Sequence, residues 1–325
     1  MERIKKILEE ERYFILATHV NPDVDGLSSV LAMTLALKNQ GKVALPLVEE
    51  APPAFLDFLH GFRELRIPED LHQEDLPLRE AVAMVFDLSE EHRLGKVAEV
   101  VKETKERVIL DHHALAGQSL PGVRLIDPKA SATALLVLRV LESLNWPISA
   151  EIAENLYAGI YSDTGGFRFE NTGEDTFLAA ARLVRLGARP AFVGEKLLEN
   201  YPPARFELLK RVLARREILA GGKAVLSYLT LSDFEEVGAR PAEAEDFATF
   251  LRSMRGVELS ALIKEIRPGE IGVSLRSRGT INVAELAFQE GGGGHLRAAG
   301  FKKNGFTVEE VVALVRSKIL VVLGG

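Results

Sequence analysis

Residues 13–25 have the sequence YFILATHVNPDVD, and this stretch decides the fold prediction. It begins with the mostly apolar segment 13–18, which has the length of a buried β-strand and is too short for an ordinary helix. The segment leads directly to three polar residues, His19, Asp23 and Asp25. In open α/β sheets, ligands bind beyond the carboxyl ends of the strands. We therefore predict a buried strand that delivers these side chains to a binding crevice.

Strand-like and helix-like segments alternate through the first half of the chain. Short apolar segments predict four further strands, at 43–48, 81–86, 107–110 and 123–126. Helical periodicity predicts helices at 27–40 and 92–105, between a capping Ser131 and Pro147, from a capping Ser149 to Tyr161, and at 175–186. Such alternation is typical of an α/β domain with a mostly parallel sheet and helices on both faces.

The consecutive prolines Pro202 and Pro203 mark a change in this pattern, because two such residues cannot lie inside a helix. After them, residues 223–231 predict a strand, and residues 259–266 and 270–276 predict a hairpin. We expect a smaller α+β domain here, with a cleft between the two domains. The predicted boundaries are 1–190 for the α/β domain, 191–204 for a linker and 205–325 for the α+β domain.

Composition limits the classes of function. The hydrophobic content of 47% and charged content of 27% are ordinary for a globular protein, which argues against disorder. The chain has no cysteine, which excludes disulfides and thiolate metal sites and suits a cytoplasmic protein. No apolar run approaches the length of a membrane span, so no membrane partner is expected. The net charge of −7 argues against a general binder of long nucleic acid, although residues 204–325 carry a basic excess.

Histidines and aspartates also follow other predicted elements, at Asp87, Asp111, His112, His113 and Asp163. Imidazole and carboxylate ligands without thiolates suit Mn²⁺, Mg²⁺, Fe²⁺ or Co²⁺. In an extended loop, Asp23 and Asp25 would point the same way and serve two adjacent ions, and Asp87 could bridge both. Two such ions can activate water and clamp the attacking and leaving oxygens of a phosphate.

Other polar residues have plainer interpretations. Asp127 also follows a predicted strand and is expected to be a turn residue. His60, His72 and His92 are expected to be ordinary surface or core histidines. An aspartate at a strand end is often only a turn or capping residue, and for Asp87 alone that interpretation would be favoured. The recurrence of these residue types at four element ends favours a metal site.

At these residues the chain resembles the DHH phosphoesterase superfamily, which is named for the triplet that stands here as Asp111, His112 and His113. The other motifs shared with the family are His-x-x-Pro-Asp-x-Asp at 19–25, the lone aspartate at 87, Asp-Thr-Gly at 163–165 and the glycine run with histidine at 291–295. Segments 167–172 and 274–278 are similar to the two-domain nano-RNase and pAp-phosphatase group. The chain departs from the common pattern at Val24 and at Ser28 and Ser29, and neither departure removes a ligand.

The resemblance implies a role for each matched residue. It implies that one ion is held by His19, Asp23 and Asp87, and the other by Asp25, Asp87, His112 and Asp163. It implies that His113 contacts the scissile phosphate or assists the leaving group, and that Asp111 orients the neighbouring histidines. The expected cofactor is a pair of divalent ions, with Mn²⁺ preferred to Mg²⁺, Fe²⁺ or Co²⁺.

The mildly basic C-terminal part holds the residues expected to bind the substrate. Glycines can expose backbone N–H groups to an anion, and arginines suit bidentate phosphate contacts. Arg276 and Arg278 alternate along a predicted strand and should share one of its faces. The expected substrate contacts are Arg276, Ser277, Arg278, Gly292, Gly293, Gly294 and His295. A cleft with metals on one side and these residues on the other would favour short substrates.

Together with the resemblance, these features imply a hydrolase that degrades dimers to pentamers of RNA or DNA to mononucleotides and converts pAp to AMP. Short oligonucleotides and pAp are thus the expected partners, and a homodimer is left open. The alternative is a phosphodiesterase for cyclic or linear dinucleotides such as c-di-AMP or pApA. An inorganic pyrophosphatase ranks lower, because such relatives lack the glycine run. A nucleotide-binding regulator without catalysis is disfavoured, because every motif ligand is present.

Overall fold

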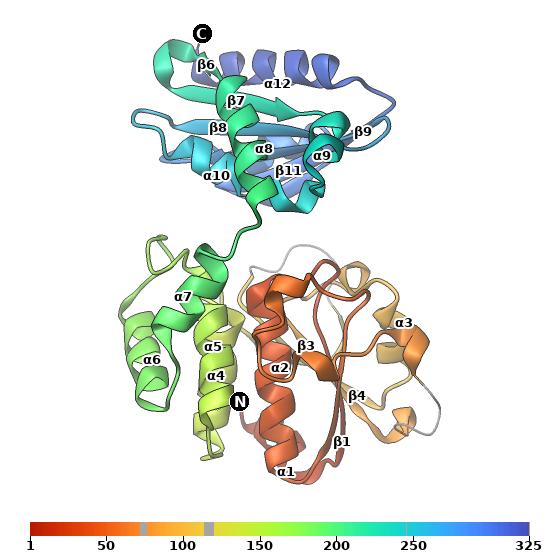
Figure 1. The fold of residues 1–325 in the computed structure, drawn as a ribbon. Helices are drawn as coiled ribbons and strands as arrows, with labels where there is room; N and C mark the ends of the chain where they lie inside the picture. Colours follow the sequence, from red (N-terminus) through yellow and green to blue (C-terminus); the bar gives the residue numbers. More distant parts are fainter. Residues whose placement is uncertain (72–76, 114–119, 245, 325) are drawn as a thin grey trace. The chain divides into compact units, whose positions relative to one another are not determined.

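The computed structural model describes residues 1–71, 77–113, 120–244 and 246–324 (Figure 1). The chain divides into two compact units, Met1–Asn200 (unit 1) and Tyr201–Gly325 (unit 2), and each has its own sheet and hydrophobic cores. His72 lies outside the described residues. Among the described helices, none combines the length and the hydropathy that crossing a membrane requires.

Unit 1 is built on a five-stranded sheet in the order β2-β1-β3-β4-β5, in which all neighbours are parallel. Its strands are β1 (Tyr13–Ala17), β2 (Val43–Leu47), β3 (Val82–Phe86), β4 (Glu106–Asp111) and β5 (Val123–Ile126). These are the five predicted strands, each within two residues of its predicted ends. The order reverses between β1 and β3, and such a switch point opens a crevice beyond the carboxyl ends of the two strands.

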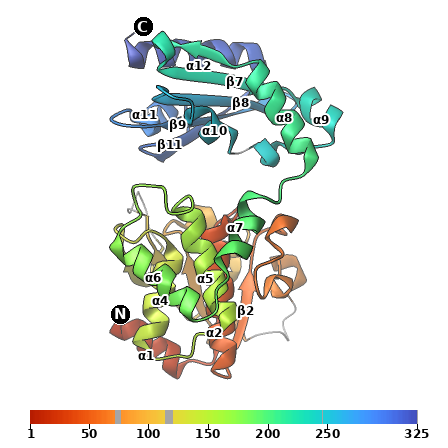
Figure 2. The same ribbon diagram turned by 60° about the vertical axis from the view of Figure 1, so that its left-hand side comes forward.

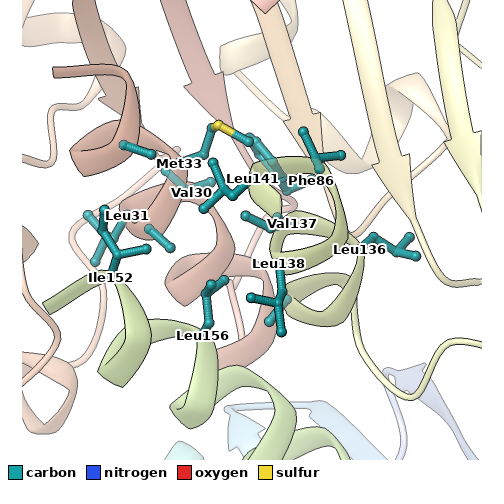
Figure 3. Packing of buried hydrophobic residues seen from close by; sticks show 14 of the residues in the cluster. Val30, Leu31, Met33, Phe86, Leu136, Val137, Leu138, Leu141, Ile152 and Leu156 are labelled. Carbon is teal, nitrogen blue, oxygen red and sulfur yellow. The ribbon is translucent and has the colours of Figure 1, made fainter. Parts of the chain in front are cut away.

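Helices cover both faces of this sheet, as predicted. Alternate residues of β1 point to opposite sides, so that Phe14 and Leu16 enter one core while Ile15 and Ala17 enter the other. The first core is shared with α1 (Glu2–Glu10), α2 (Val24–Asn39), α4 (Thr133–Ser143), α5 (Ala150–Asp163), α6 (Glu174–Arg185) and α7 (Pro190–Leu198). The second is covered by α3 (Val97–Lys102). Figure 3 shows part of the first core, where side chains of α2, α4 and α5 interdigitate.

Three features of unit 1 differ from the prediction. Residues 92–105 do not form one helix, because Gly95 separates the short 3-10 turn Glu91–Leu94 from α3. Ser131 does not cap α4, which begins at Thr133 after Ala132. Residues 191–198 of the predicted linker form most of α7, because Pro190 stands at the first helical position, where its fixed φ angle favours a helix start. Ser149 does cap α5, since its hydroxyl accepts from the Ile152 N–H.

Unit 2 contains a six-stranded mixed sheet in the order β10-β11-β9-β8-β7-β6, in which only β7 and β8 are parallel. Its strands are β6 (Glu217–Leu219), β7 (Ala224–Leu229), β8 (Leu259–Arg267), β9 (Glu270–Ser277), β10 (Gly293–His295) and β11 (Ala298–Asn304). The β8–β9 pair is the predicted hairpin. The second domain is therefore of the predicted α+β type.

Two helical layers enclose this sheet (Figure 2). One face packs against α11 (Val283–Phe288) and α12 (Val308–Leu323). The other packs against α8 (Pro203–Ala214), α9 (Leu231–Val237) and α10 (Phe247–Arg252), mainly over β7 and β8. On this second face, Ser274 and Arg276 of β9 and Gly300 of β11 line a pocket instead of a hydrophobic core.

Candidate metal centre

The carboxyl ends of β1, β3 and β4 bring the predicted metal ligands together in unit 1. His19 follows β1, Asp87 follows β3 and His112 follows β4, whereas Asp163 is the last residue of α5. The His19 Nε2 atom lies 3.4 Å from an Asp87 oxygen. The His112 Nε2 atom lies 3.5 Å from the other Asp87 oxygen and 3.4 Å from an Asp163 oxygen. Residues far apart in sequence therefore converge on Asp87.

Three overlapping sets of side chains offer ligand atoms that all lie within 4.8 Å of one another. The sets are His19, Asp23 and Asp87; Asp25, His112 and Asp163; and Asp87, His112 and His113. The first set is the group that the resemblance implied for one ion. The second holds three of the four residues implied for the other ion, and the third links Asp87 to His112. The spacing is compatible with two neighbouring cations and Asp87 between them.

Asp87 occupies a strained position. Its φ angle of 63° lies in the left-handed region, which non-glycine residues rarely adopt and which recurs at functional sites. Its N–H donates to the Leu110 carbonyl at 2.9 Å, which ties it to β4. The Thr133 hydroxyl donates to its carboxylate at 2.9 Å. Asp87 is thus a buried, oriented carboxylate, and the plain interpretation as a turn residue does not account for its surroundings.

Asp23 and Asp25 do not lie in an extended loop, which corrects the prediction for this pair. Asp23 caps α2 by accepting from the Gly26 N–H at 2.9 Å, and Asp25 lies in the first turn of that helix. The Asp25 carboxylate accepts from the Thr133 N–H at 2.6 Å and the Ala134 N–H at 2.9 Å, so it caps α4 in place of Ser131. The helical turn separates the two carboxylates, and each joins a different ligand set.

Asp111 and His113 form a hydrogen-bonded pair beside Asp87, an oxygen of which lies 3.4 Å from His113 Nδ1. One Asp111 oxygen lies 2.8 Å from His113 Nδ1 and accepts from the His113 N–H at 2.9 Å. The other oxygen accepts from the Ser89 hydroxyl. Burial opposes the charge on Asp111, but these bonds outweigh burial and lower its pKa. Asp111 therefore fixes the ring of His113, as carboxylates beside metal sites commonly do.

The protein alone does not balance the charges of the ligand sets. Burial and the neighbouring Asp87 raise the pKa of Asp25 well above its usual value, and burial with Asp23 and Asp87 does the same for Asp163. Burial disfavours the charged form of His19, yet the carboxylates of Asp23 and Asp87, which lie 3.8 Å and 3.4 Å from its Nε2 atom, outweigh burial and raise its pKa to about 10. Like-charged carboxylates disfavour one another's ionisation, and a bound cation would favour their ionised forms.

A buried nitrogen atom without a hydrogen-bond partner in the described part of the chain indicates that these side chains fit a metal ion. The Nε2 atom of His19 is buried and makes no hydrogen bond with any of the described residues. Its Nδ1 atom lies 2.9 Å from the Val20 carbonyl, so a neutral ring would donate from Nδ1 and offer Nε2 to a cation in place of the proton. Likewise His112 Nδ1 lies 3.2 Å from the Ala130 carbonyl. Imidazole nitrogens held in this way, together with carboxylates, suit a divalent transition metal.

Sequence reasoning missed three residues of this site. Thr133 orients Asp87, and Ser89 supports Asp111. Gly159 of α5 allows α2 to approach, because a Cβ there would lie 2.4 Å from the Ser28 hydroxyl and 2.8 Å from an Asp25 oxygen. An isolated glycine inside a predicted helix was the available signal for Gly159.

The residues with plain interpretations also have defined places. Asp127 accepts from the Lys129 N–H at 3.0 Å and so is a turn residue, as predicted. His60 contacts buried Glu154 at 2.9 Å, and Glu154 is also paired with Arg189 at 2.7 Å. His92 lies in the 3-10 turn before Gly95. None of these residues belongs to the ligand sets found among the described residues.

Unit 2 brings some of the predicted substrate contacts together. Arg276, Gly293 and Gly294 line a pocket of about 380 Å³, which we name the arginine pocket. Lys264 and Ser274 also line it, and sequence reasoning missed both. Its described lining does not include Arg278, Gly292 or His295, which lie nearby in sequence.

Two predictions for this strand need correction. Arg278 does not share a strand face with Arg276, because β9 ends at Ser277 and Arg278 follows it as an exposed residue. Ser277 is buried and its hydroxyl donates to the Ile281 carbonyl at 2.7 Å, so it supports the following loop instead of facing a ligand.

Arg252 donates to the Ser277 carbonyl at 2.8 Å. Burial and the nearby Arg278, Arg276 and Arg297 lower the pKa of Arg252, which reflects the concentration of positive charge here.

Comparisons with known proteins show what the chain is similar to. The model of the DHH family, N-terminal domain, matches residues 13–160, and the model of the DHHA1 domain matches residues 221–320. The chain is 33% identical over 310 residues to the "bifunctional oligoribonuclease and PAP phosphatase" of Thermus thermophilus, covering 94% of this chain and 89% of that protein. It is 26% identical to a cyclic-di-AMP phosphodiesterase of Geobacillus thermodenitrificans, covering 97% of this chain and 48% of that protein.

A solved structure has the same fold over the full length of the chain. It is the crystal structure of an exopolyphosphatase-related protein from Bacteroides fragilis, with 25% identity and a TM-score of 0.91. The match covers 100% of this chain and 97% of that chain. Two family models and a relative of similar length thus identify the family of the chain. The chain belongs to the DHH family of phosphoesterases.

Proposed function

We propose that this protein is a metal-dependent phosphoesterase that hydrolyses short oligonucleotides to mononucleotides and removes the 3′-phosphate of pAp to give AMP. The observation that carries the proposal is the convergence of His19, His112 and Asp163 on Asp87 in unit 1. DHH-family enzymes depend on metal ions, and groups that could hold them are present. The similarity to the Thermus oligoribonuclease and PAP phosphatase supports the choice of substrates.

We assign the ligands of two divalent ions, preferentially Mn²⁺, on the basis of the ligand sets. The assignment places one ion at His19, Asp23 and Asp87, and the other at Asp25, Asp87, His112 and Asp163. When bound, such a pair polarises phosphate oxygens and lowers the pKa of an attacking water. The protein contributes by orientation, because Thr133 fixes Asp87 and the start of α4 fixes Asp25.

We assign His113 to the leaving group. Its Nδ1 atom is engaged by Asp111, so that Nε2 is the nitrogen that would donate a proton to the departing oxygen. Burial opposes the charged form of His113, but the bond to Asp111 and the nearby Asp87 outweigh burial and raise its pKa. A protonated imidazole beside the scissile phosphate is suited to act as a general acid.

We assign the arginine pocket of unit 2 to a terminal phosphate of the substrate. Arg276 supplies a planar guanidinium, and Lys264 adds a second positive charge in the same pocket. The backbone of Gly293 and Gly294 allows an anion to approach without side-chain hindrance. A substrate with a second phosphate, as in pAp or a short oligonucleotide, suits these features.

A product time course tests the proposal. The substrates are 5′-labelled RNA dimers to pentamers and pAp, each with added Mn²⁺ and with a chelator as the control. We expect mononucleotides from the oligomers and AMP from pAp, in the presence of metal only. Failure to cleave a dinucleotide with Mn²⁺ present would reject the proposal.

Cyclic dinucleotides are the second candidate substrate. The similarity to the Geobacillus cyclic-di-AMP phosphodiesterase favours this candidate, but identity is lower and the chain spans about half of that protein. Parallel assays with c-di-AMP and linear pApA discriminate between the two. Faster turnover of c-di-AMP supports the second candidate, whereas turnover of pAp and RNA trimers to pentamers faster than that of either dinucleotide supports the first proposal.

A further inference from the structure

Phe288, the last residue of α11, carries an aromatic ring that unit 2 leaves in solvent. The helix turns Val283, Leu286 and Ala287 into the core, whereas Phe288 is 79% exposed. A single exposed apolar residue is ordinary on a protein surface. Phe288 differs from that ordinary case because it lines a pocket of about 300 Å³ in unit 2, which we name the Phe288 pocket.

The Phe288 pocket adjoins the arginine pocket. Gly293 and Gly294 of β10 line both of them. A Cβ atom at Gly293, which pairs with Gly300 of the arginine pocket, would meet no atom within 4 Å, so this side of β10 is open. The edge strand β10 therefore has Phe288 of α11 on one side and the cations of Arg276 and Lys264 on the other.

We propose that the Phe288 pocket binds the nucleobase of the nucleotide whose phosphate occupies the arginine pocket. This inference rests on the proposed function, because it names part of the same substrate. Proteins that bind single-stranded nucleic acids combine a cationic groove for the backbone with aromatic side chains on which bases stack. The two pockets supply both parts and share Gly293 and Gly294 of the edge strand, around which a nucleotide would bind. Phe288 thereby selects nucleotides over phosphate esters that carry no base.

Kinetics with and without a base test this role. Phe288→Ala should raise KM for pAp about tenfold, the effect of losing one stacked base, with little change in kcat. It should leave KM unchanged for ribose 3′,5′-bisphosphate, which has both phosphates and no base. Because the side chain is exposed, the substitution should not unfold unit 2. An unchanged KM for pAp, or an equal rise for both substrates, overturns the proposal.

Two further variants sharpen the assay. Phe306→Ala removes another partly exposed phenylalanine of unit 2, 44% exposed and outside both pockets, and should change neither KM. Phe288→Tyr keeps an aromatic ring and should retain the low KM for pAp. Loss of binding in Phe288→Tyr, or an equal loss in Phe306→Ala, contradicts a stacking role.

A binding measurement separates this inference from the proposed function. The single tryptophan of the chain, Trp146, lies in unit 1, so the double variant Trp146→Phe/Phe288→Trp places the sole tryptophan in the Phe288 pocket. AMP should quench its fluorescence and ribose 5-phosphate should not, whereas Trp146→Phe/Phe306→Trp should respond to neither. Absence of quenching overturns the base site even if pAp is hydrolysed. Quenching in a protein without hydrolytic activity upholds the base site and rejects the proposed function.

Discussion

The two units bury aspartates in opposite ways. In unit 2, Asp233 accepts hydrogen bonds from Arg211 at 2.8 Å, from Arg215 at 2.9 Å and from the Thr230 N–H at 2.8 Å. Burial opposes its charge, but these partners outweigh burial and hold its pKa far below the usual range. In unit 1, burial and the carboxylates around Asp163 raise the pKa of that residue well above the usual range.

This contrast separates a structural carboxylate from one that requires a cation. The charge on Asp233 is balanced by the protein, so its cluster stabilises the fold of unit 2 without a ligand. The charge on Asp163 and its neighbours is not balanced by the protein, and such perturbed groups mark functional sites. Exposure alone does not explain the difference, since the Asp163 side chain is 29% exposed and has the raised pKa, whereas that of Asp233 is 3% exposed. The number and the charge of the groups around each carboxylate distinguish the two aspartates.

The largest expected effect is on catalysis at Asp87. Asp87→Ala should lower turnover of pAp by about a thousandfold or more, because it removes the carboxylate assigned to both ions. The fold should remain intact, as judged by circular dichroism and the unfolding midpoint in a chelator. Asp127→Ala, at a turn outside the ligand sets, is the matched control and should retain activity. Substantial hydrolysis by Asp87→Ala would contradict the bridging role.

The second effect is on the stability of unit 2. Asp233→Asn should lower the free energy of unfolding by about 3 kcal/mol, because it leaves two partly buried arginine side chains without their counter-charge. Trp146 packs against the core of unit 1, so its fluorescence reports that unit, whereas circular dichroism reports both. The loss should appear in circular dichroism and not in Trp146 fluorescence. A change confined to the fluorescence transition would contradict the assignment to unit 2.

The same variant should alter the dependence of stability on pH. The folded-state pKa of Asp233 lies below its unfolded value of about 3.9, so its stabilisation is present above that pH and is lost as the pH falls toward the folded-state pKa. Wild-type unit 2 should therefore lose stability below about pH 4 more steeply than Asp233→Asn. Parallel acid profiles for the two proteins would show that Asp233 does not contribute in this way.

The strands of unit 1 were predictable because parallel strands buried on both faces are short continuous apolar runs. β3 is buried along its whole length, and its predicted bounds differ from the observed ones by one residue. Helix ends were harder to predict, because a proline can either begin a helix or end one, and a glycine can either end a helix or lie within it. Pro190 begins α7 although it was interpreted as a boundary, and Gly95 divides a segment that has helical periodicity.

The ligand residue types were predictable from motifs at strand ends, but their orientation was not. Asp25 receives hydrogen bonds from Thr133, 108 positions away, and this contact depends on how α4 packs beside α2. Local sequence favours an N-cap at Ser131, yet the tertiary contact supplies the cap from Asp25 instead. Gly159 matters for the same reason, since only the packed helices reveal which atoms a Cβ would meet.

The third effect is stabilisation of unit 1 by metal. A ligand that binds only the folded state at a hundredfold excess over its Kd adds about 2.7 kcal/mol to the free energy of unfolding. Mn²⁺ at that excess should therefore shift the Trp146 fluorescence transition upward in the wild type and not in Asp87→Ala. Asp233 is paired with arginines in unit 2 and belongs to none of the ligand sets among the described residues, so Asp233→Asn should keep the response to Mn²⁺. An equal shift in Asp87→Ala would place the binding elsewhere.

The smallest expected effect is a gain in stability when a charged residue is removed. In a chelator at pH 8, Asp163→Asn should raise the free energy of unfolding by about 1 kcal/mol, because it removes one of several mutually repelling buried carboxylates. With saturating Mn²⁺ the order should reverse, since the wild type then gains a ligand that the variant lacks. Asp57→Asn, at an exposed position, should change neither value. A variant less stable than the wild type under both conditions would mean that Asp163 is balanced by the protein, as Asp233 is, and the contrast between the units would fail.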